Sequence, residues 1–283
     1  MTQIGRSSRR HDIVLPDRDG ARVSLAWAAV SDKGHRRAVN EDSLLARSPI
    51  FAVADGMGGH TAGDFASAAV VTRLAEQLGS GFVAQDAVSD ALRAAVDDMS
   101  RGVGLTDLGT GTTVSGIALT LHDGEAYWLV FNIGDSRVYQ LLDGTLDQLT
   151  VDHSIVQQLL DAGMITPAEA EVHPHSNVIT RAVGFNEDPV PDFWLIPISA
   201  GARLLVCSDG LTKELTEHGV RHFLSIGDSP ADAANRLMEA ALGNGGRDNV
   251  SVIVVDVLET PESSAGRPRT GGRRRARSGP VTA

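Results

Sequence analysis

The sequence of 283 residues contains a single cysteine, Cys207, so no disulfide can form within the chain. One cysteine fits a reducing compartment, and we therefore expect a cytoplasmic protein. The sequence also has no run of about 18 apolar residues, so we expect no membrane span. Basic residues near the start are not followed by an apolar segment, which argues against a secretory signal.

Charge is unevenly placed along the chain. The formal net charge is −11, but the segment from Pro261 onward holds six arginines and one acid, Glu262. Setting these seven residues aside leaves 19 basic and 35 acidic residues, a net charge of −16. An acidic body binds nucleic acid poorly, so we expect no nucleic-acid partner. It suits the binding of cations, although a solvated acidic surface explains the same composition.

The chain shows neither an internal repeat nor an internal linker. Residues 1–20 are polar and predict a flexible N-terminal arm. Residues 260–283 are rich in Arg, Gly, Ser and Pro and predict a disordered tail. We therefore expect one catalytic domain over residues 21–259.

Short runs rich in β-branched residues predict strands that turn residues separate. The pairs Asp123-Gly124 and Asp143-Gly144 are typical of β-hairpins. The predicted strands are 23–31, 50–54, 112–121, 126–132, 137–142, 193–197, 203–207 and 250–258.

Helical periodicity appears in three segments. Apolar residues from Ala62 to Leu78 form one face of a helix that follows Thr61, a second helix covers 86–100, and a third covers 230–243. Because helices do not follow every strand, this order favours an α+β fold with antiparallel sheets over a doubly wound parallel sheet.

Acidic residues lie at the ends of several predicted strands, mostly beside glycine. The stretch FAVADGMGGH, residues 51–60, is an apolar strand that ends on an aspartate and a glycine-rich loop. Alone, such an Asp-Gly pair is an ordinary turn signal. This aspartate is Asp55. Asp135 and Asp209 also end predicted strands beside glycine, and Glu41, Asp42 and Asp248 come just before strands. Carboxylates that converge need positive charge between them, and oxygen ligands without cysteine or a histidine pair favour Mg²⁺ or Mn²⁺ over Zn²⁺.

The order of these motifs resembles the protein phosphatase 2C family of metal-dependent serine/threonine protein phosphatases, in its compact bacterial branch. The resemblance covers about residues 22–258. It rests on RRAVNED (36–42), ADGMGGH (54–60), GTGTT (109–113), GDSR (134–137), DHS (152–154), CSDGL (207–211) and GRDNVSVI (246–253). It implies a four-layer αββα fold, a central antiparallel β-sandwich flanked by pairs of antiparallel helices, with a binuclear metal centre at one end.

The resemblance also implies which residues bind the two metal ions. Asp55 bridges both ions, and the carbonyl of Gly56 is a ligand of one of them. Asp209 and Asp248 bind the other ion. The implied cofactor is Mn²⁺ or Mg²⁺, in two tight sites and a weaker third one.

Further residues receive supporting roles from the same resemblance. Glu41 and Asp42 hold metal-bound waters, and Asp135 forms the weaker third site together with Asp209. Arg37 grips the phosphate of the substrate. Residues 150–185 match a mobile flap that borders the substrate groove.

His60 is the candidate general acid. Animal members of the family carry a histidine directly after the Asp-Gly pair, whereas this chain has Met57 there, and His60 is the nearest histidine. The alternative, that His60 only shapes the glycine loop or holds a metal-bound water, stays open.

The implied reaction is hydrolysis of phosphoserine and phosphothreonine in proteins. A water that bridges two divalent metals attacks phosphorus, without a covalent phosphoenzyme. The expected partners are phosphorylated proteins, namely substrates of serine/threonine kinases and the kinases themselves, and we expect a monomer. Two other functions remain: a phosphatase dedicated to an anti-sigma-factor antagonist, and a phosphoprotein-binding pseudophosphatase. Intact Asp55, Asp209 and Asp248 argue against the second.

Overall fold

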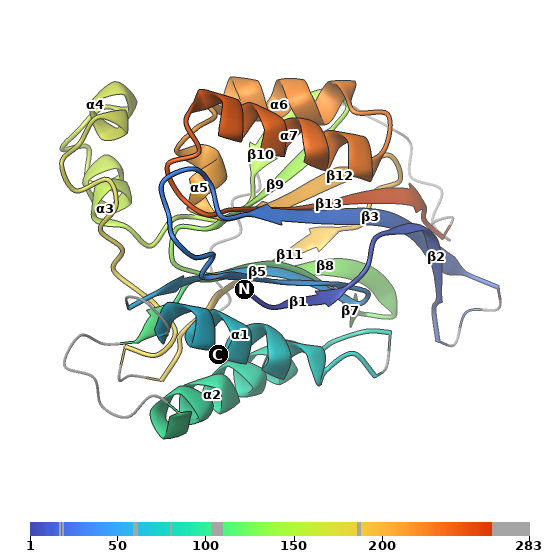
Figure 1. Cartoon of the computed structure of the whole chain (residues 1–283). Helices are drawn as coiled ribbons and strands as arrows, with labels where there is room; N and C mark the ends of the chain where they lie inside the picture. The colour runs from blue at the N-terminus through green and yellow to red at the C-terminus, as the bar shows by residue number, and fades with distance from the viewer. Residues whose placement is uncertain are drawn as a thin grey trace.

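The computed structural model describes residues 1–16, 18, 20–58, 62–79, 81–102, 110–185 and 188–261. Two β-sheets pack face to face, and a pair of helices covers the outer face of each sheet (Figure 1). The predicted α+β fold with a central sandwich in four layers is confirmed. The predicted tail beyond Pro261 lies outside the described residues.

The strands of each sheet come from both halves of the chain. The first sheet has the order β1 (Gln3–Gly5), β4 (Asp42–Arg47), β5 (Ile50–Met57), β7 (Val114–His122), β8 (Glu125–Ile133) and β11 (Asp192–Pro197), and β6 (Gly111–Thr112) pairs with β5. The second sheet has the order β10 (Thr145–Gln148), β9 (Arg137–Leu142), β12 (Arg203–Cys207), β13 (Val250–Glu259), β3 (Arg22–Asp32) and β2 (Ser8–Val14). Pairing is antiparallel except between β1 and β4, which are parallel.

Strand β5 shows why the central strands are almost continuously apolar. Phe51 and Val53 face the core between the two sheets, whereas Ala52 and Ala54 face the helices that cover the first sheet. Because successive side chains of a strand point to opposite faces, a strand covered on both sides needs apolar residues throughout. Such a run delivers Asp55 at the edge of the sandwich.

The helices bury apolar stripes on the outer faces. Helices α1 (Ala62–Ala75) and α2 (Gln85–Gly102) cover the first sheet, and α6 (Glu217–Ile226) and α7 (Pro230–Asn244) cover the second. Helix α7 begins at the N-cap Ser229, whose hydroxyl accepts a hydrogen bond from the Asp232 amide. The sequence did not predict α6.

Both predicted hairpins are confirmed. Asp123 and Gly124 join β7 to β8, and Asp143 and Gly144 join β9 to β10, with positive φ at all four residues. Two successive residues with positive φ match the twist of a two-residue hairpin loop. The turn residues therefore fix the register of both hairpins.

The N-terminal segment differs from the flexible arm that the sequence predicts. Strand β1 pairs with β4, and β2 pairs with β3 at the edge of the second sheet. Most of β2 is exposed, and Ile13 is its buried residue. A polar edge strand carries little hydrophobic signal, because its backbone hydrogen bonds rather than its side chains hold it in place.

The predicted flap forms a separate lobe beside the sandwich. It contains two short helices, α3 (Ile155–Asp161) and α4 (Pro167–Glu171), which lie at the same side of the sandwich as α5 (Asp209–Thr212) (Figure 1).

Over the described part of the chain, no helix is both long and apolar enough to cross a membrane.

Candidate metal centre

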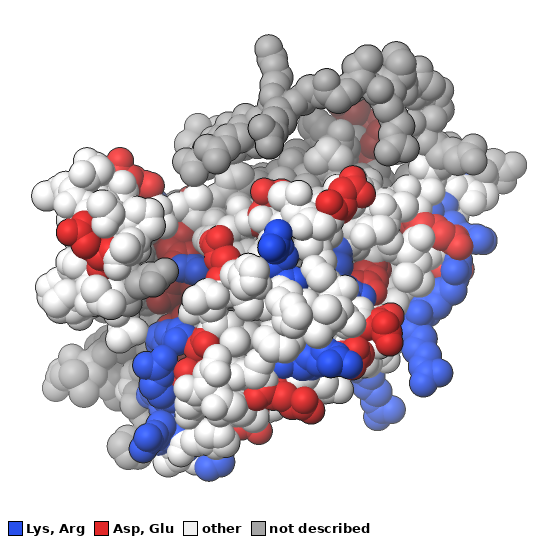
Figure 2. Space-filling model, turned by 90° about the horizontal axis from the view of Figure 1, so that it is seen from above, with Lys and Arg blue, Asp and Glu red and all other residues white. Residues whose placement is uncertain are grey.

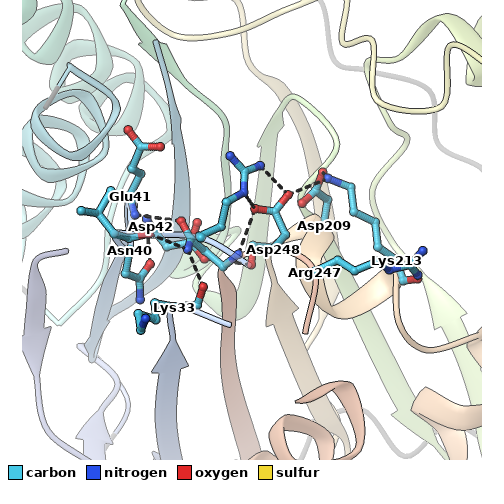
Figure 3. A network of polar contacts seen from close by, with 12 residues as sticks. Lys33, Asn40, Glu41, Asp42, Asp209, Lys213, Arg247 and Asp248 are labelled. Carbon is cyan, nitrogen blue, oxygen red and sulfur yellow. Dashed lines mark hydrogen bonds and ion pairs between the residues drawn. The ribbon is translucent and has the colours of Figure 1, made fainter. Parts of the chain in front are cut away.

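The predicted metal-binding acids lie at one end of the sandwich, on loops and strand ends of both sheets. Asp42 begins β4 and lies directly opposite Asp55 on β5. Asp209 begins α5 directly after Ser208 and strand β12, and Asp248 comes just before β13. Figure 3 shows Asp42, Asp209 and Asp248 side by side at this end. The two-sheet architecture thus brings together acids that are up to 206 residues apart in sequence.

The backbone at Gly56 explains part of the glycine pattern around Asp55. A Cβ atom built on Gly56 meets the Gly63 carbonyl oxygen at 2.1 Å and the Glu41 carbonyl oxygen at 2.7 Å. These contacts leave no space for a side chain, so β5 can approach α1 and the 41–42 segment only with glycine here. The close approach places the Gly56 and Glu41 backbones next to each other.

Mutual repulsion and burial act on the acids of this centre. Burial raises the pKa of Asp55 well above its usual value, and the charges of Asp42 and Asp209 raise it further. Burial likewise raises the pKa of Asp42 to about 7 and that of Asp135 to about 8. These carboxylates therefore need a compensating positive charge in order to stay ionised at neutral pH.

Two protein cations hold Asp248. The Arg37 Nε atom lies 2.7 Å from Asp248 Oδ1, and Arg37 Nη2 donates to Oδ2 at 2.9 Å. The Lys213 Nζ atom lies 3.0 Å from the same Oδ2 and 2.6 Å from Asp209 Oδ2 (Figure 3). Burial disfavours the charged form of Asp248, but Arg37 and Lys213 outweigh burial and lower its pKa.

Asn249 positions the loop that carries Glu41. Its side-chain oxygen accepts a hydrogen bond from the Glu41 amide, and its Nδ2 donates to the carbonyl oxygens of Lys33 and Val39, all at 2.9 Å. Only 4% of Asn249 is exposed. Asn249 belongs to the motif GRDNVSVI, but no role was predicted for it from the sequence, because its partners lie more than 200 residues away.

Two further polar residues support the acids. The Ser208 hydroxyl donates to Asp42 Oδ2 at 3.0 Å and so joins the two sheets at the centre. Glu214, whose side chain is 1% exposed, accepts hydrogen bonds from the Arg247 amide and Nε, both at 2.9 Å. The hydrogen bond from the Arg247 amide fixes the backbone directly before Asp248. Neither Ser208 nor Glu214 was among the predicted site residues.

Asp135 lies where the flap joins the sandwich. The amide of the preceding Gly134 donates to His153 Nδ1 at 3.1 Å, and His153 Nε2 lies 3.1 Å from Asp192 Oδ2. An acceptor Nδ1 means that His153 carries its proton on Nε2, which donates to Asp192. The buried His153 therefore ties the first residues of the flap to the turn that carries Asp135.

The donor set fits a hard divalent cation. Among the described residues, no three Asp, Glu, His or Cys side chains stand in an arrangement that could already hold one ion. Buried oxygens of two acids predicted for this centre, Asp42 Oδ1 and Asp209 Oδ1, nevertheless have no hydrogen-bond partner in the described part of the chain. Such oxygens are costly without a partner, and a cation that takes oxygen ligands satisfies them. The donor oxygens therefore fit a divalent cation, provided that the Asp248 side chain turns away from Arg37 and Lys213.

Other predicted and considered residues lie elsewhere. His60 is outside the described residues, as is Thr61. Cys207 is fully buried, and burial raises its pKa to about 12, in agreement with a packing role. A cavity of about 730 Å³ lies at the far end of β4, where Arg6, His11 and Arg47 line it. It contains none of the predicted site residues.

Comparisons with known proteins agree with this architecture. Residues 33–242 match the family model described as protein phosphatase 2C. The serine/threonine protein phosphatase PstP of Mycobacterium tuberculosis is 42% identical over 247 residues, which cover 84% of this chain. The chain spans 46% of the length of that relative.

Solved structures match over the same region. A crystal structure of the M. tuberculosis phosphatase PstP/Ppp has a TM-score of 0.77 at 40% identity, covering 84% of this chain and 100% of the other. The catalytic domain of PstP in complex with two manganese ions has a TM-score of 0.71 at 39% identity, covering 84% and 99%. From the family match and these similarities, the chain belongs to the protein phosphatase 2C family.

Proposed function

We propose that this chain is a metal-dependent serine/threonine protein phosphatase that hydrolyses phosphoserine and phosphothreonine in proteins. The observation that carries the proposal is the convergence of Asp42, Asp55, Asp209 and Asp248 at one end of the sandwich. The named activity of the relatives and the manganese complex of PstP support the same conclusion. The acids of this centre supply oxygen ligands for metal ions. A cysteine nucleophile is not available, since Cys207 is buried.

Each acid has a proposed part in holding the metal ions. Asp55 and the Gly56 carbonyl, together with Asp209 and Asp248, hold two divalent cations. Bound divalent cations supply Lewis acidity, lower the pKa of water and neutralise charge on the phosphoryl group. We assign Asp55 to both ions because it lies opposite Asp42 on the neighbouring strand and is within the electrostatic influence of Asp209 and Asp248.

Residues around the proposed metal ligands have supporting roles. Glu41 and Asp42 act on waters around the ions, and the Ser208 hydroxyl holds Asp42 in place. Asp135 forms the weaker third site with Asp209. We take Mn²⁺ or Mg²⁺ as the cation.

Arg37 is proposed to bind the phosphate. Its side chain is half exposed, and its Nε and Nη2 atoms already bind the two oxygens of Asp248 in a fork. Two oxygens of a phosphate present a similar geometry to a guanidinium group. Arg37 can therefore exchange the carboxylate of Asp248 for the substrate without a change of its own donor atoms.

The proposal also covers the substrates, the oligomeric state and the location of the enzyme. The substrates are phosphoproteins that serine/threonine kinases have modified, including the kinases themselves. We propose a monomeric, cytoplasmic enzyme with one catalytic domain, which includes the N-terminal strands β1 and β2, and His60 as the general acid.

Turnover of a phosphothreonine peptide tests the activity. Wild type should release phosphate with Mn²⁺ or Mg²⁺ and should lose this activity in excess EDTA. Asp55→Asn should lower turnover by at least roughly 10³-fold, because it removes the shared ligand, while circular dichroism stays unchanged. Asp147→Asn, an exposed aspartate on β10, is the matched control and should behave as wild type. Full activity of wild type in EDTA contradicts the proposal.

A further inference from the structure

Lys213 places a protein cation on the same carboxylates that are proposed to bind a divalent ion. Its Nζ atom bridges Asp209 Oδ2 at 2.6 Å and Asp248 Oδ2 at 3.0 Å. Lys213 lies four residues after Asp209, so one turn of α5 brings the two side chains to the same face. The Lys213 side chain is 30% exposed, and both aspartates are 14% exposed, so water screens these contacts only in part.

Lysine is a rare residue in this chain, so its presence at position 213 is notable. Lys213 and Lys33 are its two lysines, whereas 23 of its basic residues are arginines. A lysine ammonium is a compact point charge on a flexible stem, unlike the planar fork of arginine. It is therefore the side chain that most closely imitates a small cation between two carboxylates, and it can swing away on its stem.

Asp209 and Asp248 differ in how many of their carboxylate oxygens are already engaged by protein groups. Asp209 keeps its buried Oδ1 without a hydrogen-bond partner in the described part of the chain. Asp248 has both oxygens engaged, Oδ1 by Arg37 and the Asn249 amide and Oδ2 by Arg37 and Lys213. A divalent ion that uses Asp248 must displace one of these two cations. Arg37 is half exposed, and Lys213 is the more enclosed of the two.

We propose that Lys213 is an internal competitor of the divalent cation for Asp209 and Asp248, and that it makes this ion the more weakly bound of the two. The inference rests on the proposed metal centre and names a residue that sets its affinity. Lys213 neutralises the two carboxylates before the ion arrives.

Three variants of the full-length chain test the proposal by calorimetric titration with Mn²⁺ alone. Lys213→Met keeps the length of the side chain and removes its charge, so one Mn²⁺ should bind roughly tenfold more tightly and the other should bind as in wild type. Lys213→Arg retains the charge and should stay near wild type. Lys33→Met removes the charge of the other, exposed lysine and serves as the matched control.

Thermal unfolding in EDTA supplies a readout that does not depend on metal. Lys213→Met should unfold at a lower temperature than wild type, because Asp209 and Asp248 lose a counter-charge. The same variant should gain more from added Mn²⁺ than wild type gains. Damage to the fold alone weakens metal binding, so a tighter ion in a less stable protein distinguishes competition from a structural role.

The outcomes separate this inference from the proposed function. If Lys213→Met binds both Mn²⁺ ions with wild-type or lower affinity, Lys213 is not a competitor, while the metal centre itself stands. If Lys33→Met produces the same tightening, the effect belongs to net charge and the inference also falls. If wild type binds no Mn²⁺, the proposed function and this inference fail together.

Discussion

Asn249 shows how one buried amide can position a whole segment of the centre. Its side chain satisfies the Glu41 amide and two carbonyl oxygens from the loop before it. An amide is suited to this task because one group accepts and the other donates two hydrogen bonds. Replacement by a residue without these atoms leaves the backbone groups buried without partners.

We therefore expect Asn249→Ala to destabilise the fold by about 2–4 kcal/mol, given the usual cost of unsatisfied buried polar groups. The variant should also bind Mn²⁺ more weakly, because Glu41 and Asp248 flank the lost contacts. Urea unfolding and calorimetric titration measure the two effects. Asn177→Ala, at an exposed position of the flap, is the control and should change neither. Wild-type stability of Asn249→Ala would contradict the proposed positioning role.

The sequence predicted the acids of the candidate site but not the residues that contact them. Asp55 and Asp209 were recognisable because each ends an apolar strand and precedes a glycine, which is a local pattern. The contact between Lys213 and Asp248 joins residues 35 positions apart, and that between Asn249 and Glu41 joins residues 208 apart. No local pattern carries such contacts. They exist only once both sheets have formed.

Among the elements, strands with a strong pattern were predicted closely. The predicted strands 137–142 and 203–207 coincide with β9 and β12, since both are apolar and bounded by turn residues. Strand β2 was missed because it is polar and lies at a sheet edge. Helix α6 was missed although it has an N-cap at Thr216, because it is 10 residues long and the apolar stripe it buries, Val220 and Leu224, is short.

The flap carries exposed apolar residues that fit contact with a protein substrate. Met164 is 71% exposed after α3, and Val172 is 82% exposed at the end of α4. His153 anchors the start of the same segment beside Asp135. Large apolar side chains at the surface of a lobe next to the site are available to bury area against a partner.

We expect the double change Met164→Ser and Val172→Ser to raise KM for a phosphoprotein by roughly fivefold, from the loss of buried apolar area. KM and kcat for p-nitrophenyl phosphate should stay unchanged, since this small substrate does not reach the lobe. Steady-state kinetics on both substrates measure the difference. Val14→Ser, which alters a 66% exposed valine on β2, is the control. Equal losses on both substrates would show that the flap acts on the centre itself.

At the scale of the whole molecule, the arrangement of charged side chains at the candidate metal centre differs from that on the surface. Acidic and basic side chains are interspersed over the face that helices α6 and α7 form (Figure 2). At the centre, by contrast, the carboxylates of Asp42 and Asp55 come from one sheet and those of Asp209 and Asp248 adjoin the other. Cations bound there would link the two halves of the sandwich.

Saturating Mn²⁺ should therefore stabilise both sheets together. One ion at a hundred times its dissociation constant contributes about 2.7 kcal/mol, which for a domain of this size raises Tm by roughly 5–10 °C. Hydrogen exchange should slow in both β5 and β13, because opening either sheet at this end breaks the link. The measurements are thermal unfolding and hydrogen exchange with and without Mn²⁺, with NaCl at equal ionic strength and Asp55→Asn as controls. Protection confined to one sheet, or reproduced by NaCl, would show that the ion does not join them.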